Sequence, residues 1–326
     1  MHIVITSINE PTEAVRRFAT ISEHELIVIG DEKSPKNYKS PNVDFYDIGR
    51  QKTLKFKLAG ALPYNHYSRK MLGYLIAIEN GADCIMDTDD DNIPFENFHF
   101  EIFDGVKLVS EPNLGFVNIY QEFSDSHIWP RGLPLNLINR KGPDLFVQKK
   151  FIKSGVIQGL ANGNPDVDAI YRLTDDSEII FKDRSSITFA KGTWSPFNSQ
   201  NTLFRKELFP LLYLPVTVSF RYTDILRSFV AQAIMWNEGF NLTFSKASVL
   251  QRRNYHDYVE DFRSEIPMYL TTEKSCQIIS AAVKFNSSIE ENLVSVYDSL
   301  CEEGIVDQIE LLTLKNWLED LSRKSS

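Results

Sequence analysis

Four aspartates lie within five positions directly after a short apolar run. Residues 84–92 read Cys-Ile-Met-Asp-Thr-Asp-Asp-Asp-Asn, and Ala82–Met86 has the length and composition of a buried strand. The carboxylates at its end are Asp87, Asp89, Asp90 and Asp91. Carboxylates this close repel one another unless a cation neutralises them. A hard divalent ion, held by one or two carboxylates and by substrate phosphates, meets that need. The run therefore predicts a Mg²⁺ or Mn²⁺ site for a phosphorylated substrate.

Other uses of an acidic run can be tested by spacing. A calcium-binding EF-hand loop starting at Asp87 requires Gly at its sixth position and Glu at its twelfth, where Asn92 and Phe98 stand. The sequence also lacks a Gly-x-x-x-x-Gly-Lys-Ser/Thr phosphate loop and the Gly-x-Ser-x-Gly and His-Glu-x-x-His motifs. A solvated acidic turn without chemistry remains the alternative to the metal site.

Composition indicates a folded α/β protein. Of 326 residues, 43% are hydrophobic and 24% charged, and the net charge of −9 argues against nucleic-acid binding. The three cysteines lack metal-ligand spacing, which favours a reducing compartment. The first residues predict a strand rather than a signal peptide, and the longest apolar region, 208–220, is too short to cross a bilayer. We therefore expect a cytoplasmic protein without a transmembrane segment; peripheral membrane contact and oligomerisation stay open.

The elements that must position these carboxylates begin with a predicted parallel sheet. Residues 2–7 and 25–30 are strand-like, and a helical segment, Glu13–Thr20, lies between them. The polar loop 30–35 follows the second strand, and ligands of open α/β sheets bind beyond the carboxyl ends of their strands. Asn65–Asn80 is predicted to be helical and to end at Gly81. Arg69 and Lys70, near its start, are either diphosphate contacts or solvated cations.

Three later segments, 128–138, 159–169 and 192–201, are dense in Gly, Pro, Asn and aromatic residues and predict binding loops. Asp224 follows them at the start of a predicted helix, with Thr223 as N-cap and Gly239 at the C-terminus. A carboxylate there is either a capping partner or a base facing the cleft. From about residue 268, the segments 272–285, 288–303 and 307–322 predict amphipathic helices without chemistry.

Six of these motifs, in order, resemble those of the STELLO family. They are residues 68–78, 87–92, 128–132, 159–169, 192–204 and 215–227, and the resemblance covers roughly residues 1–258. That family is described as glycosyltransferase-like, with a nucleotide-diphospho-sugar fold of the GT-A type, a Rossmann-like mixed sheet flanked by helices. The resemblance implies such a domain over residues 1–260 and a helical C-terminal appendage over 261–326. Plant members are Golgi membrane proteins, but their location and cellulose-related role are not carried over to this chain.

A more distant resemblance is to the reversibly glycosylated polypeptides, which are UDP-arabinopyranose mutases. Their self-glycosylated arginine falls on Arg131 and their acidic helix start on Asp224. The chain departs from their pattern at Thr223, where a second acid is expected, and at Arg252-Arg253, where a histidine is expected. These departures put the mutase reaction in doubt more than the fold.

Residues and resemblance together predict a metal-dependent glycosyltransferase that moves a sugar from a nucleotide-sugar donor to a glycan or other hydroxyl acceptor. Asp89 and Asp91 are the metal candidates, supported by Asp90 and Asp87. The candidates for catalysis or acceptor binding are Asp224 as general base, Arg131, Asp166 and Asp168. The candidates for donor contacts are Asp31 and Lys33 at the nucleoside, Arg69 and Lys70 at the diphosphate, and Arg252, Arg253 and His256 closing over the phosphates.

Two other functions stay open. The first is a sugar-nucleotide mutase or self-glycosylating protein that acts through Arg131. The second is a non-catalytic scaffold that keeps the glycosyltransferase fold as a platform. An intact acidic cluster argues against the scaffold, because crowded carboxylates serve no purpose there. The donor sugar and the acceptor cannot be deduced from the sequence.

Overall fold

The computed structural model describes residues 1–140, 145, 147–253 and 257–323. The strands are β1 His2–Thr6, β2 Glu25–Ile29, β3 Val43–Tyr46, β4 Cys84–Thr88, β5 Asn92–Pro94, β6 Asp104–Val109, β7 Gly115–Phe116, β8 Gln148–Gly163, β9 Ile187–Phe189, β10 Thr193–Trp194, β11 Asn201–Arg205 and β12 Asn241–Gln251. The α-helices are α1 Glu13–Phe18, α2 Ile48–Gln51, α3 Lys57–Ala61, α4 Lys70–Glu79, α5 Tyr120–Phe123, α6 Ala169–Thr174, α7 Thr223–Asn237, α8 Tyr258–Ala282, α9 Ile289–Glu302 and α10 Ile309–Leu321. Three 3₁₀ segments are η1 Tyr67–Arg69, η2 Leu135–Leu137 and η3 Lys206–Leu212.

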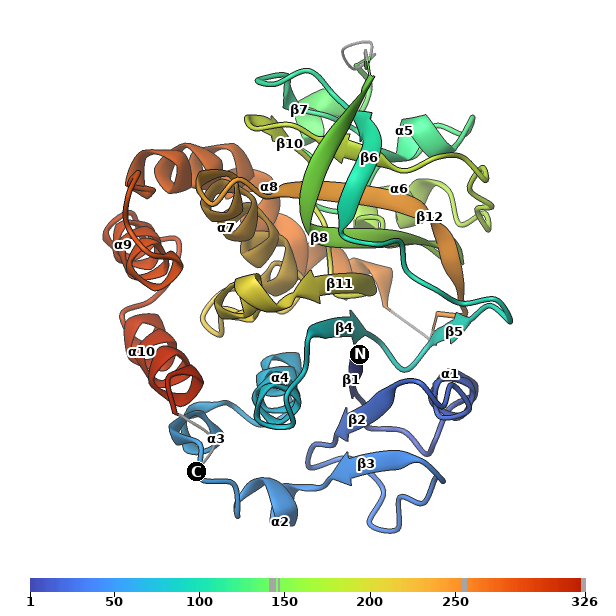
Figure 1. Cartoon of the computed structure of the whole chain (residues 1–326), viewed down its shortest axis with the longest axis vertical. Helices are drawn as coiled ribbons and strands as arrows, with labels where there is room; N and C mark the ends of the chain where they lie inside the picture. The colour runs from blue at the N-terminus through green and yellow to red at the C-terminus, as the bar shows by residue number, and fades with distance from the viewer. Residues whose placement is uncertain (141–144, 146, 254–256, 324–326) are drawn as a thin grey trace.

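The N-terminal half is a parallel sheet with helices on both faces (Figure 1). Strands β3, β2, β1 and β4 lie side by side in that order and are parallel. Side chains alternate between the faces of a strand. Val4 of β1 accordingly shares a buried cluster with α4, whereas Ile3 and Ile5 share another with Val15 of α1. The predicted strands and helices in this half are therefore confirmed, with α4 preceded by the turn η1.

Helix α4 approaches β1 unusually closely because Gly73 has no side chain. A Cβ atom at this position would lie 2.5 Å from a methyl group of Val4 and 3.0 Å from Ile29. This close approach brings the start of α4 directly against the end of β4.

The remaining strands extend the sheet and bring the chain back to the acidic run. Among the described residues the large sheet has ten strands, in the order β3-β2-β1-β4-β11-β8-β6-β9-β12-β5, with β11 antiparallel to β4. An additional pairing of β12 with β8 closes β8, β6, β9 and β12 into a ring. Strand β5 pairs with the end of β12, so residues 89–91, between β4 and β5, lie beside Gln251. Residues 89–91 are called the acidic turn below.

The predicted strand over residues 82–86 is displaced toward the aspartates, and Asp87 lies inside β4. Its carboxylate is fully buried between Lys70 Nζ, 2.8 Å from Oδ1, and Arg227 Nη1, 2.8 Å from Oδ2. Burial would raise the pKa of Asp87, but Lys70 and Arg227 together hold it below its ordinary value. Protein cations thus neutralise Asp87, which joins β4 to α4 and α7.

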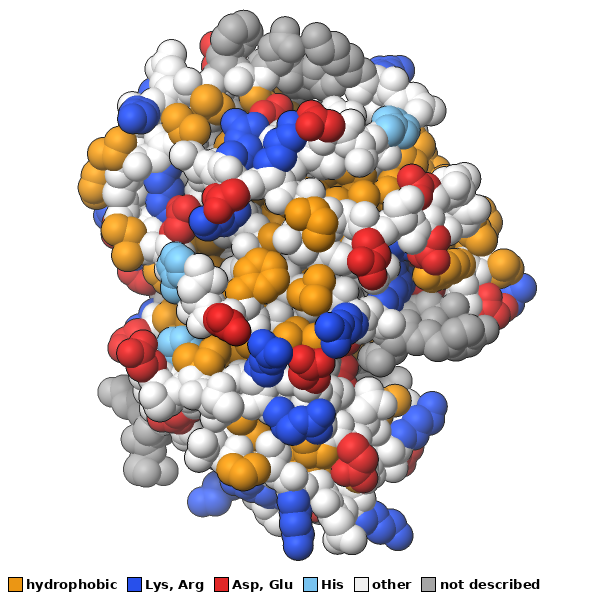
Figure 2. Space-filling view, turned by 90° about the vertical axis from the view of Figure 1, so that its right-hand side faces the viewer, with side chains coloured by type: hydrophobic (Ala, Val, Ile, Leu, Met, Phe, Trp, Pro, Cys, Tyr) orange, Lys and Arg blue, Asp and Glu red, His pale blue; other side chains and the backbone are white. Residues whose placement is uncertain are grey.

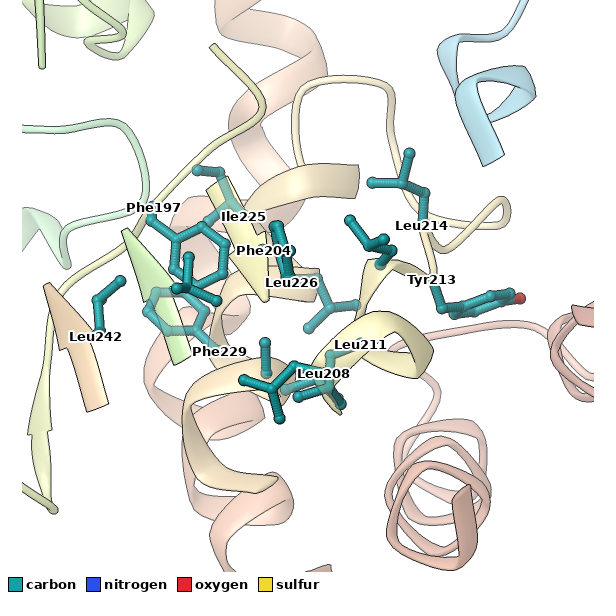
Figure 3. Close-up of a cluster of buried hydrophobic side chains, with 14 of the residues drawn as sticks. Phe197, Phe204, Leu208, Leu211, Tyr213, Leu214, Ile225, Leu226, Phe229 and Leu242 are labelled. Carbon is teal, nitrogen blue, oxygen red and sulfur yellow. The ribbon is translucent and has the colours of Figure 1, made fainter. Parts of the chain in front are cut away.

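Helix α7 packs its apolar side chains around this ion pair. Figure 3 shows Ile225 and Phe229 of α7 beside Phe204 of β11 in the buried cluster. The helix begins at Thr223, with Tyr222 at the N-cap position and no side-chain cap, so the prediction of Thr223 as N-cap is wrong. Gly239, with φ +76°, follows its C-terminus as predicted.

The C-terminal helices pack on the core through buried apolar residues. Met268 of α8, Leu293 of α9 and Trp317 of α10 belong to the same buried cluster as α4 and α7. The predicted helices 288–303 and 307–322 correspond to α9 and α10, whereas 272–285 is the second half of α8, which begins at Tyr258. The carboxylate of Asp320 accepts hydrogen bonds from the first backbone N–H groups of α3, so α10 joins the N-terminal half. No helix among the described residues is long and apolar enough to cross a membrane, and the cytoplasmic location stays a prediction.

We expect Lys70→Met to lower the free energy of unfolding by about 3–5 kcal/mol, because it removes one of the two cations that neutralise the fully buried Asp87 carboxylate. Urea denaturation measures the loss. Lys206→Met is the control, since the Lys206–Asp83 pair spans 3.8 Å at the exposed surface, and it should change stability by no more than about 0.5 kcal/mol. Equal stability of the two variants would contradict a structural role for Lys70.

Candidate functional site

A cavity of about 530 Å³ opens at the carboxyl ends of β1, β2 and β4. Its volume lies within the range of roughly 300–1,000 Å³ typical of small-molecule sites. The lining residues come from the ends of the strands, from η1, from the predicted binding loops and from the start of α7. They are Thr6, Ser7, Ile8, Asn9, Ile29, Gly30, Asp31, Lys33, Asn65, His66, Tyr67, Arg69, Asp89, Asp90, Asp91, Arg131, Asp166, Ser199, Gln200, Phe220, Arg221, Asp224, Gln251 and Arg253.

The acidic turn presents three carboxylates to this cavity, and these differ in how far hydrogen bonds or cations of the protein stabilise their negative charge. Asp90 is held by the protein, because its Oδ2 accepts hydrogen bonds from Ser7 Oγ at 2.5 Å and Asn9 Nδ2 at 3.0 Å. Asp89 contacts Lys70 Nζ at 2.9 Å, yet burial raises its pKa to about 6. Burial, with Asp89 and Asp90 nearby, raises the pKa of Asp91 to about 7. Negative charge at Asp89 and Asp91 is therefore poorly compensated.

Asp91 also carries a buried acceptor without a partner. Its Oδ2 accepts a 3.2 Å hydrogen bond from Gln251 Nε2, whereas its buried Oδ1 has no hydrogen-bond partner among the described residues. An orphaned, buried carboxylate oxygen beside a second under-neutralised carboxylate fits a hard cation. No group of three or more His, Cys, Asp or Glu in the described ranges could hold a metal alone. A bound metal would therefore need further ligands from substrate phosphates and water.

The second charged group of the cavity is centred on Arg131. Its guanidinium donates to both oxygens of Asp166, at 2.7 and 2.8 Å, and to both oxygens of Asp224, at 3.0 Å each. Arg131 also donates to the carbonyl of Arg221, so all five N–H groups of the guanidinium are in use. Gly132 has φ +94°, and a Cβ there would lie 2.4 Å from Ile225, which lets this loop pack against α7.

Ser199 joins this group to the buried ion pair of β4. Its backbone N–H donates to Asp224 Oδ2 at 3.2 Å, and its hydroxyl accepts from Arg227 Nη2 at 2.9 Å. Charges of alternating sign therefore run along the cavity wall at Asp89, Asp224, Arg131 and Asp166 and behind it at Lys70, Asp87 and Arg227, with Ser199 linking Arg227 to Asp224. In order they are Asp89, Lys70, Asp87, Arg227, Asp224, Arg131 and Asp166.

Of the remaining donor-contact candidates, some line the cavity and others do not. Asp31, Lys33, Arg69 and Arg253 line the cavity, as predicted. Arg69 Nε and Nη2 donate to Gln51, whose amide in turn bonds the carbonyls of Gly30 and Tyr46, so Arg69 also supports the end of β2. Lys70 is not among the lining residues, because it lies behind the wall, bonded to Asp87 and Asp89.

Two further candidates, Asp168 and Arg252, are not among the described residues that line the cavity. Asp168 is fully buried and caps α6, since Oδ1 accepts from Tyr171 N at 2.8 Å and Oδ2 from Trp129 Nε1 at 2.7 Å. The exposed Arg252 pairs with Glu13 at 3.0 Å, and only its backbone N–H contacts the acidic turn, at the carbonyl of Asp91. His256 lies outside the described residues.

Sequence reasoning missed several lining residues. Ser7 and Asn9 follow β1, where the rule that selected Asp31 after β2 applies equally. Gln251 and Arg221 had no local signal, because their roles depend on partners far away in the chain. Acidic and basic side chains are interspersed over the face shown in Figure 2, rather than gathered into one strongly basic surface there.

Comparison with known proteins agrees with the motifs. Residues 221–325 match the family model of the STELLO glycosyltransferases. Two relatives from Arabidopsis thaliana are named probable glycosyltransferase STELLO2 and probable glycosyltransferase STELLO1. This chain is 28% and 29% identical to them over 346 aligned positions, which cover 98% of this chain and 44% of each relative. The chain thus spans less than half the length of the curated relatives it matches.

The matched region is longer than the motifs predicted. Similarity was expected over roughly residues 1–258, whereas the family model runs to residue 325 and includes α8, α9 and α10. The large mixed sheet flanked by helices is consistent with a glycosyltransferase fold. The predicted resemblance to the STELLO glycosyltransferases is confirmed.

Proposed function

We propose that this chain is a metal-dependent glycosyltransferase that transfers a sugar from a nucleotide-sugar donor to a hydroxyl group of a glycan or other acceptor. The observation that carries this proposal is the acidic turn just after β4, where the partly exposed carboxylates of Asp89 and Asp91 are under-neutralised and the buried Oδ1 of Asp91 has no hydrogen-bond partner among the described residues. The similarity to proteins named probable glycosyltransferases supports the reaction class.

The charges of the cavity explain why the donor needs a divalent cation. Among the lining residues the carboxylates are Asp31, Asp89, Asp90, Asp91, Asp166 and Asp224, six in all, and the cations are Lys33, Arg69, Arg131, Arg221 and Arg253, five in all. A diphosphate that entered alone would add negative charge to a site that already has an excess. A divalent ion, which Asp89 and Asp91 would hold, would offset this negative charge when the donor binds.

The strand arrangement supports a GT-A-type fold. Strands β3, β2, β1 and β4 form a parallel sheet, β11 lies antiparallel beside β4, and the acidic turn follows β4. A nucleoside would then lie at the ends of β1 and β2, near Asp31 and Lys33. The diphosphate would lie between the acidic turn and Arg253, and the reacting sugar would lie toward Asp224.

In this arrangement each side chain has a specific task. The metal, held by Asp89 and Asp91, would stabilise negative charge on the departing nucleoside diphosphate. Asp224 would accept the proton of the attacking hydroxyl. Arg131 and Ser199 donate to its two oxygens and hold the carboxylate in one orientation at the cavity wall. Arg131 therefore orients the base rather than the donor.

The geometry disfavours the mutase and self-glycosylation alternative. A covalent sugar on Arg131 requires a deprotonated guanidinium nitrogen. Burial alone would lower the pKa of Arg131, but Asp166 and Asp224 raise it well above the ordinary value. Its five N–H groups are also in use, so no nitrogen is available for attack.

The first test measures thermal stabilisation by a panel of nucleotide sugars with and without Mn²⁺. We expect one donor to raise the melting temperature by several degrees only when Mn²⁺ is present, because ligand binding stabilises the folded state. Asp89→Asn with Asp91→Asn should abolish this shift without lowering the melting temperature of the free protein, since the substitution removes mutual repulsion.

Asp83→Asn is the matched control, because Asp83 is exposed just before β4, and it should keep the full shift. Metal-dependent stabilisation in the double variant would contradict the metal assignment. Absence of stabilisation of the wild-type chain by every donor would favour the scaffold function.

The second test concerns Arg131. We expect the intact mass of the protein to stay unchanged after incubation with the stabilising nucleotide sugar and Mn²⁺. Arg131→Lys should reduce turnover by at least about tenfold, because a lysine cannot bond two carboxylates in the same bidentate way, while donor binding is retained. A hexose or pentose adduct that disappears in Arg131→Ala would instead support the mutase function.

A further inference from the structure

Helix α8 carries two carboxylates toward the cavity wall. Asp261 and Glu265 are four residues apart and therefore lie on the same face of the helix. The Glu265 side chain is fully buried, and only a small part of Asp261 is exposed. Buried carboxylates are costly unless they are paired, so their partners show what this face of α8 does.

Their partners are two arginines that line the cavity. Arg221 Nε and Nη2 lie 2.8 and 2.7 Å from Glu265 Oε1, and Arg221 Nε lies 4.0 Å from Asp261 Oδ1. Arg253 Nη2 lies 3.0 Å from Asp261 Oδ2. Arg221 and Arg253 come from segments on either side of α7 and β12, and α8 holds them together.

The two arginines line the same cavity as the acidic turn and the base candidate, and each lies near one of them in the chain or through a backbone contact. Arg253 follows the end of β12, where the backbone N–H of Arg252 donates to the carbonyl of Asp91 at 3.1 Å. Arg221 precedes Asp224 by three residues, and its carbonyl accepts a hydrogen bond from Arg131. In the proposed reaction the diphosphate must occupy this region, between the metal and the sugar.

The charge and shape of the two guanidinium groups suit a diphosphate. Burial and the neighbouring Arg221 lower the pKa of Arg253, so the two cations repel each other. An anion placed between them relieves this repulsion, and the planar guanidinium matches a phosphate through paired hydrogen bonds.

We infer that Arg221 and Arg253 form a phosphate-binding pair for the nucleoside diphosphate, and that Glu265 and Asp261 of α8 are positioning residues that set its geometry. The inference rests on the proposed function and adds to it a binding role for the C-terminal helices. Asp261 and Glu265 lie in the first half of α8, before the segments from about residue 268 that were predicted to be helices without chemistry.

The experiment compares nucleoside diphosphates with their monophosphates. Calorimetry in the presence of Mn²⁺ measures the affinity of the wild-type chain for UDP, GDP and ADP, and then for the monophosphate of the best-bound one. Glu265→Gln removes the charge that orients Arg221. We expect it to weaken binding of the diphosphate by about tenfold and binding of the monophosphate by less than about threefold.

Two controls separate positioning from general stability. Tyr269→Phe removes the 2.5 Å hydrogen bond to Glu265 Oε2 but leaves the contact with Arg221 at Oε1. Glu260→Gln changes an exposed acid of the same helix that pairs with Arg263. Both should keep the wild-type affinities. If Glu265→Gln does not fold, Arg221→Lys should give the same selective loss.

The outcomes distinguish this inference from the proposed function. Equal loss for diphosphate and monophosphate, or the same loss in Tyr269→Phe, would overturn the positioning role alone. Unchanged affinities in a folded Glu265→Gln or Arg221→Lys variant would also overturn it. A wild-type chain that binds no nucleoside diphosphate would overturn the proposed function and this inference together.

Discussion

The fully buried Asp87 carboxylate is the interaction on which the arrangement of the site depends. It joins Lys70 of α4 and Arg227 of α7 through two contacts of 2.8 Å. A buried ion pair adds little net stability compared with apolar packing, but an incomplete one is strongly destabilising. The three elements are therefore held in the one arrangement in which each carboxylate oxygen of Asp87 faces a cation. The acidic turn begins two residues later, and its position follows from that arrangement.

The aspartates of the site fall into two groups, according to whether arginine or lysine side chains neutralise them. Asp87, Asp166 and Asp224 are matched by arginine or lysine within the protein, which leaves their carboxylates fixed in place. Burial and neighbouring carboxylates raise the pKa values of Asp89 and Asp91, and the positive charge nearby does not offset this rise. Fixed carboxylates suit orientation and proton transfer, whereas under-neutralised ones suit a cation that arrives with the substrate. The same residue type thus differs in charge compensation because its surroundings differ, and the proposed division between metal binding and proton transfer rests on that difference.

Local sequence patterns predicted those strands and helices that depend on interactions between residues close together in the chain. The apolar strands β1 and β2, and the helix α4 that ends just before Gly81, are encoded within a few residues. The position of the acidic turn at the cavity also followed, because strand ends converge in parallel sheets.

Long-range pairing could not be predicted in this way. Asp87 and Arg227 are 140 residues apart, so nothing near Asp87 indicated that the protein neutralises it. Asp168 was predicted to be a site residue because nothing near it in the sequence indicates its partner Trp129, which lies 39 residues earlier and donates a hydrogen bond to its carboxylate. The pairing of Glu265 with Arg221 depends on how α8 packs against the cavity wall, which the local sequence does not indicate. Side chains whose roles depend on distant charges need the folded structure to be recognised.

The pairing of β5 with β12 has a consequence for the order in which the chain folds. Gln251, which bonds Asp91, is 160 residues further along the sequence, and contacts of such separation form late because the entropy of closing the intervening loop opposes them. The parallel strands β1, β2 and β4 can assemble earlier from nearby segments. During synthesis the acidic turn would then stay open to solvent until β12 has emerged and docked. The cavity lined by the acidic turn and Gln251 would therefore be complete only after residue 251 has been synthesised and β12 has docked.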